Sequence, residues 1–217
     1  MALTFDHLAA RSGRTRSLVI MLHGFGSNGA AMMPLSSTLS VGMPDTDFIS
    51  PDAPIVAQGN PEGRKWYSIP ELDGTTAEES YSCMKQASEE LDRFVDEQSQ
   101  KSGVPPSSIA LVGFSQGAGL CFENAPRRRA RLAGVVAIAG RMKAKDTLIA
   151  ESRSRPPFLV LTGAKDRLLD SAETEATILS LTEAGIQVKH RIMADTGHAI
   201  SDGGIAATLA FLTHVLA

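Results

Sequence analysis

The feature that most constrains this sequence is a pentapeptide, Gly-Phe-Ser-Gln-Gly, at residues 113–117. It follows a short apolar run at residues 109–112, which a Pro-Pro-Ser-Ser segment at 105–108 precedes, as is typical of a buried strand. In a G-x-S-x-G pattern between a strand and a helix, the chain turns so sharply that only glycine fits two residues before and after the serine. The sequence therefore predicts a turn that holds the Ser115 hydroxyl clear of a sheet as a nucleophile.

Apolar runs alternate with helical patterns along the chain. The runs are too short for helices and are bounded by turn residues, which predicts strands at residues 17–22, 47–50, 109–113, 134–139, 157–162 and 187–193. Helical spacing of apolar residues is plainest at 80–101, and further helices are expected at 115–124, 171–184 and 203–216. We therefore expect one α/β domain over residues 1–217, with a mostly parallel central sheet, helices on both faces and no cap domain.

The composition is that of an ordinary globular protein with no affinity for nucleic acid. The 217 residues are 43% hydrophobic and 21% charged, and the formal net charge of -3 gives no basic footprint for nucleic acid. The sequence has no run of 18 apolar residues, so stable membrane insertion is not expected. The first residues lack the basic and apolar regions of a secretory signal, and a cytoplasmic location is therefore expected.

Two groups of residues are interpreted as structural. Cys83 and Cys121 lack metal-ligand spacing and are expected to be reduced and packed as small apolar groups, with a disulfide as the alternative. The basic run at residues 127–131 follows Pro126 and is interpreted as a solvated turn. The alternative is that this run attracts an anionic substrate or an acidic surface.

A serine hydroxyl needs a base to accept its proton and a carboxylate to orient that base. Asp166 follows the strand expected at 157–162, and His198 lies between the last expected strand and the last expected helix. The carboxyl ends of parallel strands share one edge of the sheet, and open α/β sheets build their sites at that edge. The sequence therefore predicts Ser115 as nucleophile, Asp166 as acid and His198 as base.

These assignments have structural alternatives. An aspartate after a strand often caps a helix, and a Gly-His pair is often part of a surface loop. Among the competing acids, Asp170 is a second candidate to orient the base, whereas Asp195 and Asp202 lie close to His198 in sequence. The remaining histidines considered, His7, His190 and His214, are interpreted as ordinary structural or surface residues.

Attack on an ester carbonyl places negative charge on oxygen, and backbone N–H groups are needed to stabilise it. One donor is expected from the amide of Gln116, at the start of the helix that follows the serine. The other is expected from the amide of Phe25, in the His-Gly-Phe-Gly turn at residues 23–26. The sequence has neither G-x-G-x-x-G nor Gly-Lys-Ser/Thr, so nucleotide binding is disfavoured, and no cofactor or metal is expected.

The longest irregular stretch of the sequence, residues 51–76, contains four prolines and the only tryptophan, Trp66. Irregular loops of this length are usually functional. We therefore expect the stretch to cover the site and Trp66 to contact the substrate, with a plain surface loop as the alternative.

Several of these motifs together resemble a known family, the small phospholipase/carboxylesterase group of α/β hydrolases, which includes bacterial carboxylesterases and acyl-protein thioesterases. The resemblance extends over most of the chain and rests on residues 22–26, 50–54, 64–67, 113–118, 163–166 and 197–200. It implies an α/β-hydrolase fold, Ser115, Asp166 and His198 in the roles given above, and the amides of Phe25 and Gln116 as the oxyanion hole. It is also compatible with a homodimer. The chain departs from the family pattern at residues 167–170, where Arg-Leu-Leu-Asp replaces apolar residues and a proline.

The sequence thus predicts a serine carboxylesterase that hydrolyses small or short-acyl esters through an acyl-enzyme, with a small-molecule ester as its partner. An acyl-protein thioesterase or a lysophospholipase would use the same chemistry on a different leaving group, and acyl transfer to an acceptor other than water is a third alternative. A non-catalytic binding protein on the same fold is the alternative of another class.

Overall fold

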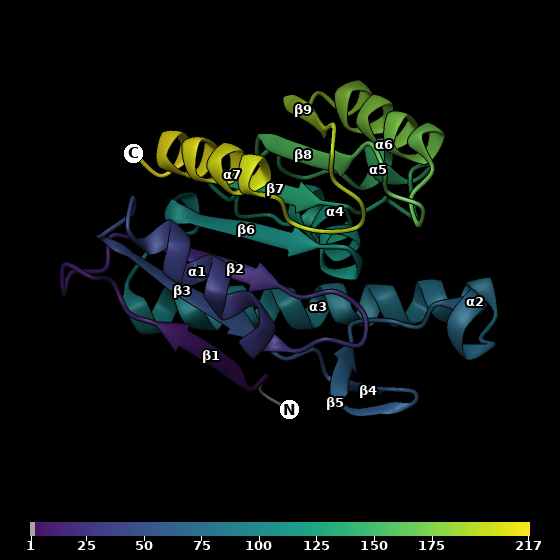
Figure 1. Cartoon of the computed structure of the whole chain (residues 1–217), viewed down its shortest axis with the longest axis horizontal. Helices are drawn as coiled ribbons and strands as arrows, with labels where there is room; N and C mark the ends of the chain where they lie inside the picture. The colour runs from purple at the N-terminus through teal and green to yellow at the C-terminus, as the bar shows by residue number, and fades with distance from the viewer. Residues whose placement is uncertain (1–2) are drawn as a thin grey trace.

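The computed structural model describes residues 3–217 and, over that range, forms a sheet of seven strands covered by helices (Figure 1). The strands are β1 (Phe5–Leu8), β2 (Ser17–Leu22), β3 (Thr46–Pro51), β4 (Ile55–Ala57), β5 (Asn60–Lys65), β6 (Ile109–Phe114), β7 (Gly134–Ile138), β8 (Phe158–Gly163) and β9 (Val188–Met193), of which β4 and β5 form a separate hairpin. The helices are α1 (Met33–Ser40), α2 (Pro70–Asp73), α3 (Ala77–Ser102), α4 (Gln116–Arg127), α5 (Leu148–Glu151), α6 (Ser171–Glu183) and α7 (Asp202–Val215). Two short 3-10 helices precede α1 and β6.

The seven strands lie in the order β1-β3-β2-β6-β7-β8-β9, and every neighbouring pair is parallel except β1 and β3. The chain therefore builds outward from β2 in both directions, with β3 on one side of it and β6 on the other. The carboxyl ends of β2 and β6 flank the point where the strand order reverses. Open α/β sheets bind their ligands in the crevice at such a point.

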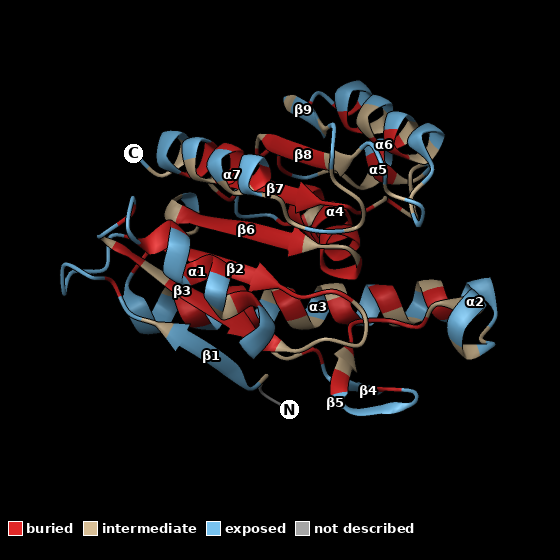
Figure 2. Ribbon diagram, in the orientation of Figure 1, coloured by how far each residue is buried: buried red, intermediate tan, exposed pale blue. Residues whose placement is uncertain are grey.

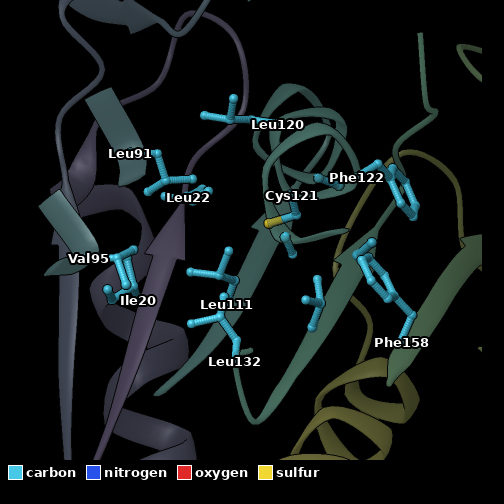
Figure 3. Close-up of a cluster of buried hydrophobic side chains, with 14 of the residues drawn as sticks. Ile20, Leu22, Leu91, Val95, Leu111, Leu120, Cys121, Phe122, Leu132 and Phe158 are labelled. Atoms are coloured by element: carbon cyan, nitrogen blue, oxygen red, sulfur yellow. The ribbon is translucent and has the colours of Figure 1, made fainter. Parts of the chain in front are cut away.

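Two apolar layers enclose the sheet. On one face, α3, α4 and α6 pack against alternate strand residues such as Ile20, Leu111 and Phe158, and Figure 3 shows Leu91 of α3 and Phe122 of α4 turned toward them. On the other face, α1 and α7 cover the side chains of the opposite parity, and these two helices lie on the near side of the sheet in Figure 1. Because both faces are covered, the central strands β2, β6 and β7 are buried almost throughout (Figure 2).

The six strands predicted from the sequence are confirmed, with ends displaced by no more than one residue. The predicted helices correspond to α3, α4, α6 and α7. Strand β1 was not expected, because its residues are mostly exposed and it is held at the sheet edge by antiparallel pairing with β3. Helix α1 was also not expected, because three of its eight residues are serines and Pro34 lies in its first turn.

The basic run at residues 127–131 is the expected solvated turn at residues 129–131, which are exposed, but not at its first two residues. Arg127 is the last residue of α4 and pairs with Glu151 of α5 at 2.7 Å. Arg128, only 3% exposed, pairs with Asp92 and Asp96 of α3. The two arginines therefore join α4 to its neighbours. Their partners lie far away in the sequence, so no local pattern identified them.

The two cysteines are free, and Cys121 lies in the core between α4 and the sheet (Figure 3). Within residues 3–217, no helix combines the length and the apolar character needed to cross a bilayer.

Candidate active site

Ser115 lies between β6 and α4 in a backbone conformation that is rare for a residue with a side chain, with φ of 52° and ψ of -113°. Such a conformation costs roughly 1–3 kcal/mol and persists only where its surroundings enforce it. Two glycines make that packing possible. A Cβ on Gly113 would lie 2.5 Å from the Gly117 carbonyl, and one on Gly117 would lie 2.2 Å from the Leu22 carbonyl oxygen. The turn therefore packs in direct backbone contact with the carboxyl end of β2.

His198 lies beside the Ser115 hydroxyl. Its Nε2 is 2.8 Å from Ser115 Oγ, and its Nδ1 is 2.8 Å from Asp166 Oδ2. Because a carboxylate only accepts, Nδ1–H donates to Asp166, which leaves Nε2 of the neutral ring to accept from the serine hydroxyl. The Asp166 side chain is only 2% exposed, and its second oxygen accepts from the Leu168 N–H at 2.8 Å. The structure thus brings together the three residues that the sequence singled out.

The turn after β8 and the loop after β9 form one packed unit, and this is why Asp166 and His198 meet. The Ala164 N–H donates to the Met193 carbonyl at 3.0 Å, and the Lys165 N–H donates to the Thr196 carbonyl at 2.9 Å. Gly163 permits this approach, since a Cβ there would lie 2.3 Å from the Thr196 oxygen. The acid and the base are therefore positioned by backbone hydrogen bonds between two adjacent loops.

The competing acids have other contacts. Asp170 caps α6 by accepting from the Ala172 N–H at 2.9 Å. Asp195 is exposed and pairs with Lys165 at 2.9 Å. His190 contacts Thr162 at 2.9 Å, on the exposed strand β9. None of these three residues lines the cavity at Ser115 within the described residues 3–217.

Phe25 and Gln116, the predicted donors to an oxyanion, line the same cavity as Ser115 and His198. Gln116 is the first residue of α4, so its N–H has no acceptor inside the helix and lies at the positive end of the helix dipole. Phe25 follows β2, next to Gly24, whose Cβ if present would lie 3.3 Å from Ser115 Cβ. The two amides therefore come from the chain segments on either side of the crevice.

Residues 51–76, named here the covering segment, contain the β4–β5 hairpin and α2 rather than an irregular loop. The hairpin braces the turn after β2, because the Gly26 N–H donates to the Arg64 carbonyl at 2.8 Å and the Arg64 N–H donates to the Ser27 carbonyl at 2.6 Å. Lys65 and Asp73 close the segment with a buried ion pair at 2.7 Å. Burial alone would raise the pKa of Asp73, but the hydrogen bonds from Lys65 and Thr75 hold it well below its usual range.

The expectation that Trp66 contacts the substrate is corrected by the structure. Trp66 is 1% exposed and does not line the cavity. Its indole N–H donates to the His23 carbonyl at 2.9 Å, which places the ring beneath the turn after β2. Tyr67, the next residue, lines the cavity instead, and burial raises the pKa of its phenol. An aromatic pair in a loop does not reveal from sequence which ring points into the core.

The Gln116 side chain links the covering segment to the nucleophile turn. Its Oε1 accepts from the Trp66 N–H at 2.8 Å, and its Nε2 donates to the Tyr67 carbonyl at 2.7 Å. Gln116 is buried, so both bonds are shielded from water. The sequence analysis assigned only the backbone amide of Gln116 a role, and the side-chain bonds could not be found without the fold, because their partners lie 49 and 50 residues away.

His23 is a second buried histidine of the site region, and the sequence analysis did not single it out. Its Nδ1–H donates to the Gly24 carbonyl at 2.8 Å, and its Nε2 accepts from the Ala53 N–H at 3.1 Å. Burial lowers the pKa of His23, outweighing the opposing effects of the Gly24 carbonyl and the Asp52 charge. The neutral ring therefore joins the turn after β2 to the covering segment.

The cavity in front of Ser115 has a volume of about 810 Å³. Its wall is mostly apolar, with contributions from Phe25, Met32, Ile69, Leu72, Phe114, Leu168, Leu169 and Ile200. Leu72 and Leu168 lie on its rim and are 58% and 70% exposed. Among residues 3–217, no cluster of three or more His, Cys, Asp or Glu side chains is arranged to hold a metal ion.

A mostly parallel sheet with helices on both faces, and a serine on a strained turn beside a histidine at the strand-order reversal, are the features of a serine hydrolase of the α/β-hydrolase fold. The profile of the Phospholipase/Carboxylesterase family matches residues 6–216, and the chain belongs to that family.

Relatives of known name agree with this assignment. Esterase YpfH of Escherichia coli is 27% identical over 213 residues, which cover 97% of this chain and 89% of that protein. Acyl-protein thioesterase 1 of Cryptococcus neoformans is 34% identical over 127 residues, 56% of this chain and 52% of that protein. The crystal structure of esterase PE8 superposes with a TM-score of 0.93 at 32% identity, covering 100% of both chains.

Proposed function

We propose that this protein is a carboxylesterase that hydrolyses small or short-acyl esters through an acyl-enzyme on Ser115. The observation that carries the proposal is the series of two hydrogen bonds, each 2.8 Å, from Ser115 Oγ through His198 to Asp166. A serine, a base and an orienting carboxylate in this geometry supply what attack on an ester carbonyl requires. Ser115 and His198 both line the cavity, so an ester bound there can reach the serine hydroxyl.

In the proposed mechanism, His198 Nε2 takes the Ser115 proton as Oγ attacks the ester carbonyl. Asp166 keeps Nδ1 protonated and stabilises the imidazolium that forms. The amides of Phe25 and Gln116 donate to the oxyanion of the tetrahedral intermediate. His198 then gives its proton to the leaving alcohol, and water repeats the two steps on the acyl-enzyme, which releases the acid and restores Ser115.

The apolar wall of the cavity supports an acyl chain bound next to Ser115. A second candidate, an acyl-protein thioesterase or lysophospholipase, is favoured by the exposed leucines Leu72 and Leu168 on the cavity rim. Those side chains would extend the apolar surface for a longer acyl chain. The two candidates share their chemistry and differ in substrate length and leaving group.

The test is hydrolysis of 4-nitrophenyl esters from acetate to palmitate by the wild type and by Ser115→Ala. The proposal expects the highest kcat/KM at short chains and a loss of about 10⁴-fold or more in the variant. A maximum at palmitate would favour the thioesterase or lysophospholipase. Turnover that survives in a folded Ser115→Ala variant, or no turnover of any ester by the wild type, would contradict the proposal.

A further inference from the structure

The cavity at Ser115 adjoins a second cavity whose lining differs in character. The second cavity has a volume of about 470 Å³ and shares three lining residues with the first: Glu71, Arg141 and Lys143. The wall near Ser115 is mostly apolar, whereas the shared wall is charged. A substrate that extends from Ser115 toward the second cavity therefore passes from an apolar to a charged surface.

The three shared charges differ in their partners. Arg141 forms an ion pair with Glu173. Glu71 is exposed to solvent. Lys143 is half-buried and, like Arg64 and Lys145, forms no ion pair with any group in residues 3–217, whereas Lys65, Arg127, Arg128 and Arg141 are paired. Lys143 is therefore the shared cation whose charge is left without a contacting carboxylate in the part of the chain described.

Neutral groups hold the Lys143 ammonium in place. It donates to Ser80 Oγ at 2.9 Å, and that hydroxyl in turn donates to the Ser68 carbonyl at 2.6 Å. It also lies 5.2 Å from the centre of the Tyr67 ring, whose face attracts cations. Burial lowers the pKa of Lys143, although the charge of Glu71 opposes that effect. The charges of Asp73 and Glu123 act in the same direction as that of Glu71, but no carboxylate of residues 3–217 contacts the ammonium. An ammonium partly removed from water and without a contacting carboxylate gains free energy when an anion binds it directly.

We propose that Lys143 determines specificity by binding a carboxylate carried by the ester substrate. The inference rests on the proposed esterase function and names the substrate class: esters that bear a free carboxylate, such as half-esters of dicarboxylic acids. The ester group lies at Ser115 among apolar side chains, and the carboxylate lies where the two cavities join. Arg141, already paired with Glu173, contributes less.

The test compares anionic and neutral esters of matched length. One series places the carboxylate on the acid, as in mono-4-nitrophenyl adipate against 4-nitrophenyl hexanoate. The other places it on the alcohol, as in the butanoate ester of 4-hydroxybutanoate against butyl butanoate. The measured quantity is the ratio of kcat/KM for the anionic ester to that for the neutral ester, because effects common to both substrates cancel in it.

The proposal expects this ratio to fall by about tenfold or more in Lys143→Met in at least one series, which also identifies the side of the ester that is recognised. Lys143→Arg keeps the charge and retains more of the ratio than Lys143→Met. Lys145→Met is the matched control, because Lys145 lines the second cavity but not the cavity at Ser115, and the change in net charge is the same. An equal ratio in wild type and folded Lys143→Met, in both series, would overturn the proposal.

A binding measurement separates this inference from the proposed function. Calorimetric titration of Ser115→Ala with monoethyl adipate and with ethyl hexanoate needs no turnover. The inference expects the anionic ester to bind more tightly, with the difference lost in Ser115→Ala/Lys143→Met. Equal affinity for these two esters, and for the alcohol-side pair of the butanoate ester of 4-hydroxybutanoate and butyl butanoate titrated in the same way, would overturn it. If the wild type hydrolyses no ester, the proposed function fails, and this titration still decides whether Lys143 binds carboxylates.

Discussion

Two regions meet at the site and are held in place in different ways. One is the nucleophile turn, taken here together with its flanking elements β6 and α4 (residues 109–127). The other is the covering segment (residues 51–76). The turn is fixed by backbone sterics, since Gly113 and Gly117 sit where a Cβ would overlap neighbouring backbone atoms. The covering segment is fixed by side-chain bonds, chiefly the Lys65–Asp73 ion pair within the segment and the two bonds to the distant residue Gln116. A position where only glycine fits can be recognised from the local sequence, whereas a hydrogen bond to a distant residue cannot.

The difference predicts how each region fails. A steric lock fails as a whole, because one added methyl group forces apart the strand and the helix that pack there. A region held by separate polar bonds loses stability in steps, one bond at a time. The expected effects below run from the largest to the smallest.

Breaking the steric lock should have the largest effect. Gly117→Ala places a Cβ 2.2 Å from the Leu22 oxygen and 2.8 Å from the His23 oxygen, so β2 and α4 must separate. We expect a loss of about 4 kcal/mol or more in the free energy of unfolding, measured by urea denaturation. Gly203→Ala is the control, because its Cβ meets only Met193 Sδ at 3.4 Å and the change should stay within about 1 kcal/mol. Equal stability of the two variants would show that the turn has room to relax.

Breaking the ion pair of the covering segment should come next. Lys65→Met leaves the Asp73 carboxylate buried without its cation, for which we expect a loss of about 3 kcal/mol. Adding Asp73→Asn should restore part of that loss. Hydrogen exchange is expected to accelerate in the covering segment and not in β6. Exchange that accelerates equally in both regions would mean that they unfold together and that the comparison is wrong.

Breaking the link between the two regions should cost about 2 kcal/mol. Gln116→Met leaves the Trp66 N–H and the Tyr67 carbonyl buried without partners.

Trp66→Phe removes one bond, from the indole to the His23 carbonyl, and should cost about 1 kcal/mol. Because Trp66 does not line the cavity, its replacement should leave acyl-length preference unchanged. A changed preference in Trp66→Phe would restore the original expectation that this residue contacts the substrate.

Acid should weaken the contact between the turn after β2 and the covering segment. The pKa of His23 is lowered in the folded protein from its ordinary value of 6.5. Just below pH 6.5, His23 is therefore protonated in the unfolded chain but remains neutral in the folded chain. Stability should therefore fall as the pH falls from 7 to 5, by at most about 2 kcal/mol from this residue. His23→Asn should remove that part of the pH dependence, whereas the exposed His214→Asn should not. Identical slopes in wild type and His23→Asn would contradict the assignment.

The same contrast explains what the sequence predicted. The buried parallel strands are continuous apolar runs, so their limits were found to within one residue. Ser115 and Asp166 each follow such a strand, and His198 follows β9, a parallel strand of the same sheet that is mostly exposed, so the order of the strands was enough to suggest that the three residues meet. Strand β1 and helix α1 lack an apolar pattern and depend on pairing and packing with distant residues.

The predictions that the structure corrects concern side chains whose burial depends on contacts with residues far away in the sequence. Arg128 reads as part of a charged run and is buried because Asp92 and Asp96 face it from α3. Trp66 reads as a loop aromatic and is buried because the His23 carbonyl accepts its indole N–H. In both cases the neighbouring residues in the sequence do not distinguish a buried side chain from an exposed one. The burial follows only from contacts made in the folded chain.

The central claim, that His198 activates Ser115 as a nucleophile, is tested most directly by covalent labelling. Wild type and His198→Ala are treated with a fluorophosphonate, and the adduct is located and its rate measured by peptide mass spectrometry. We expect one adduct, on Ser115, that forms at least about 100-fold more slowly in His198→Ala. An adduct on another residue, or equal rates in the two proteins, would contradict it.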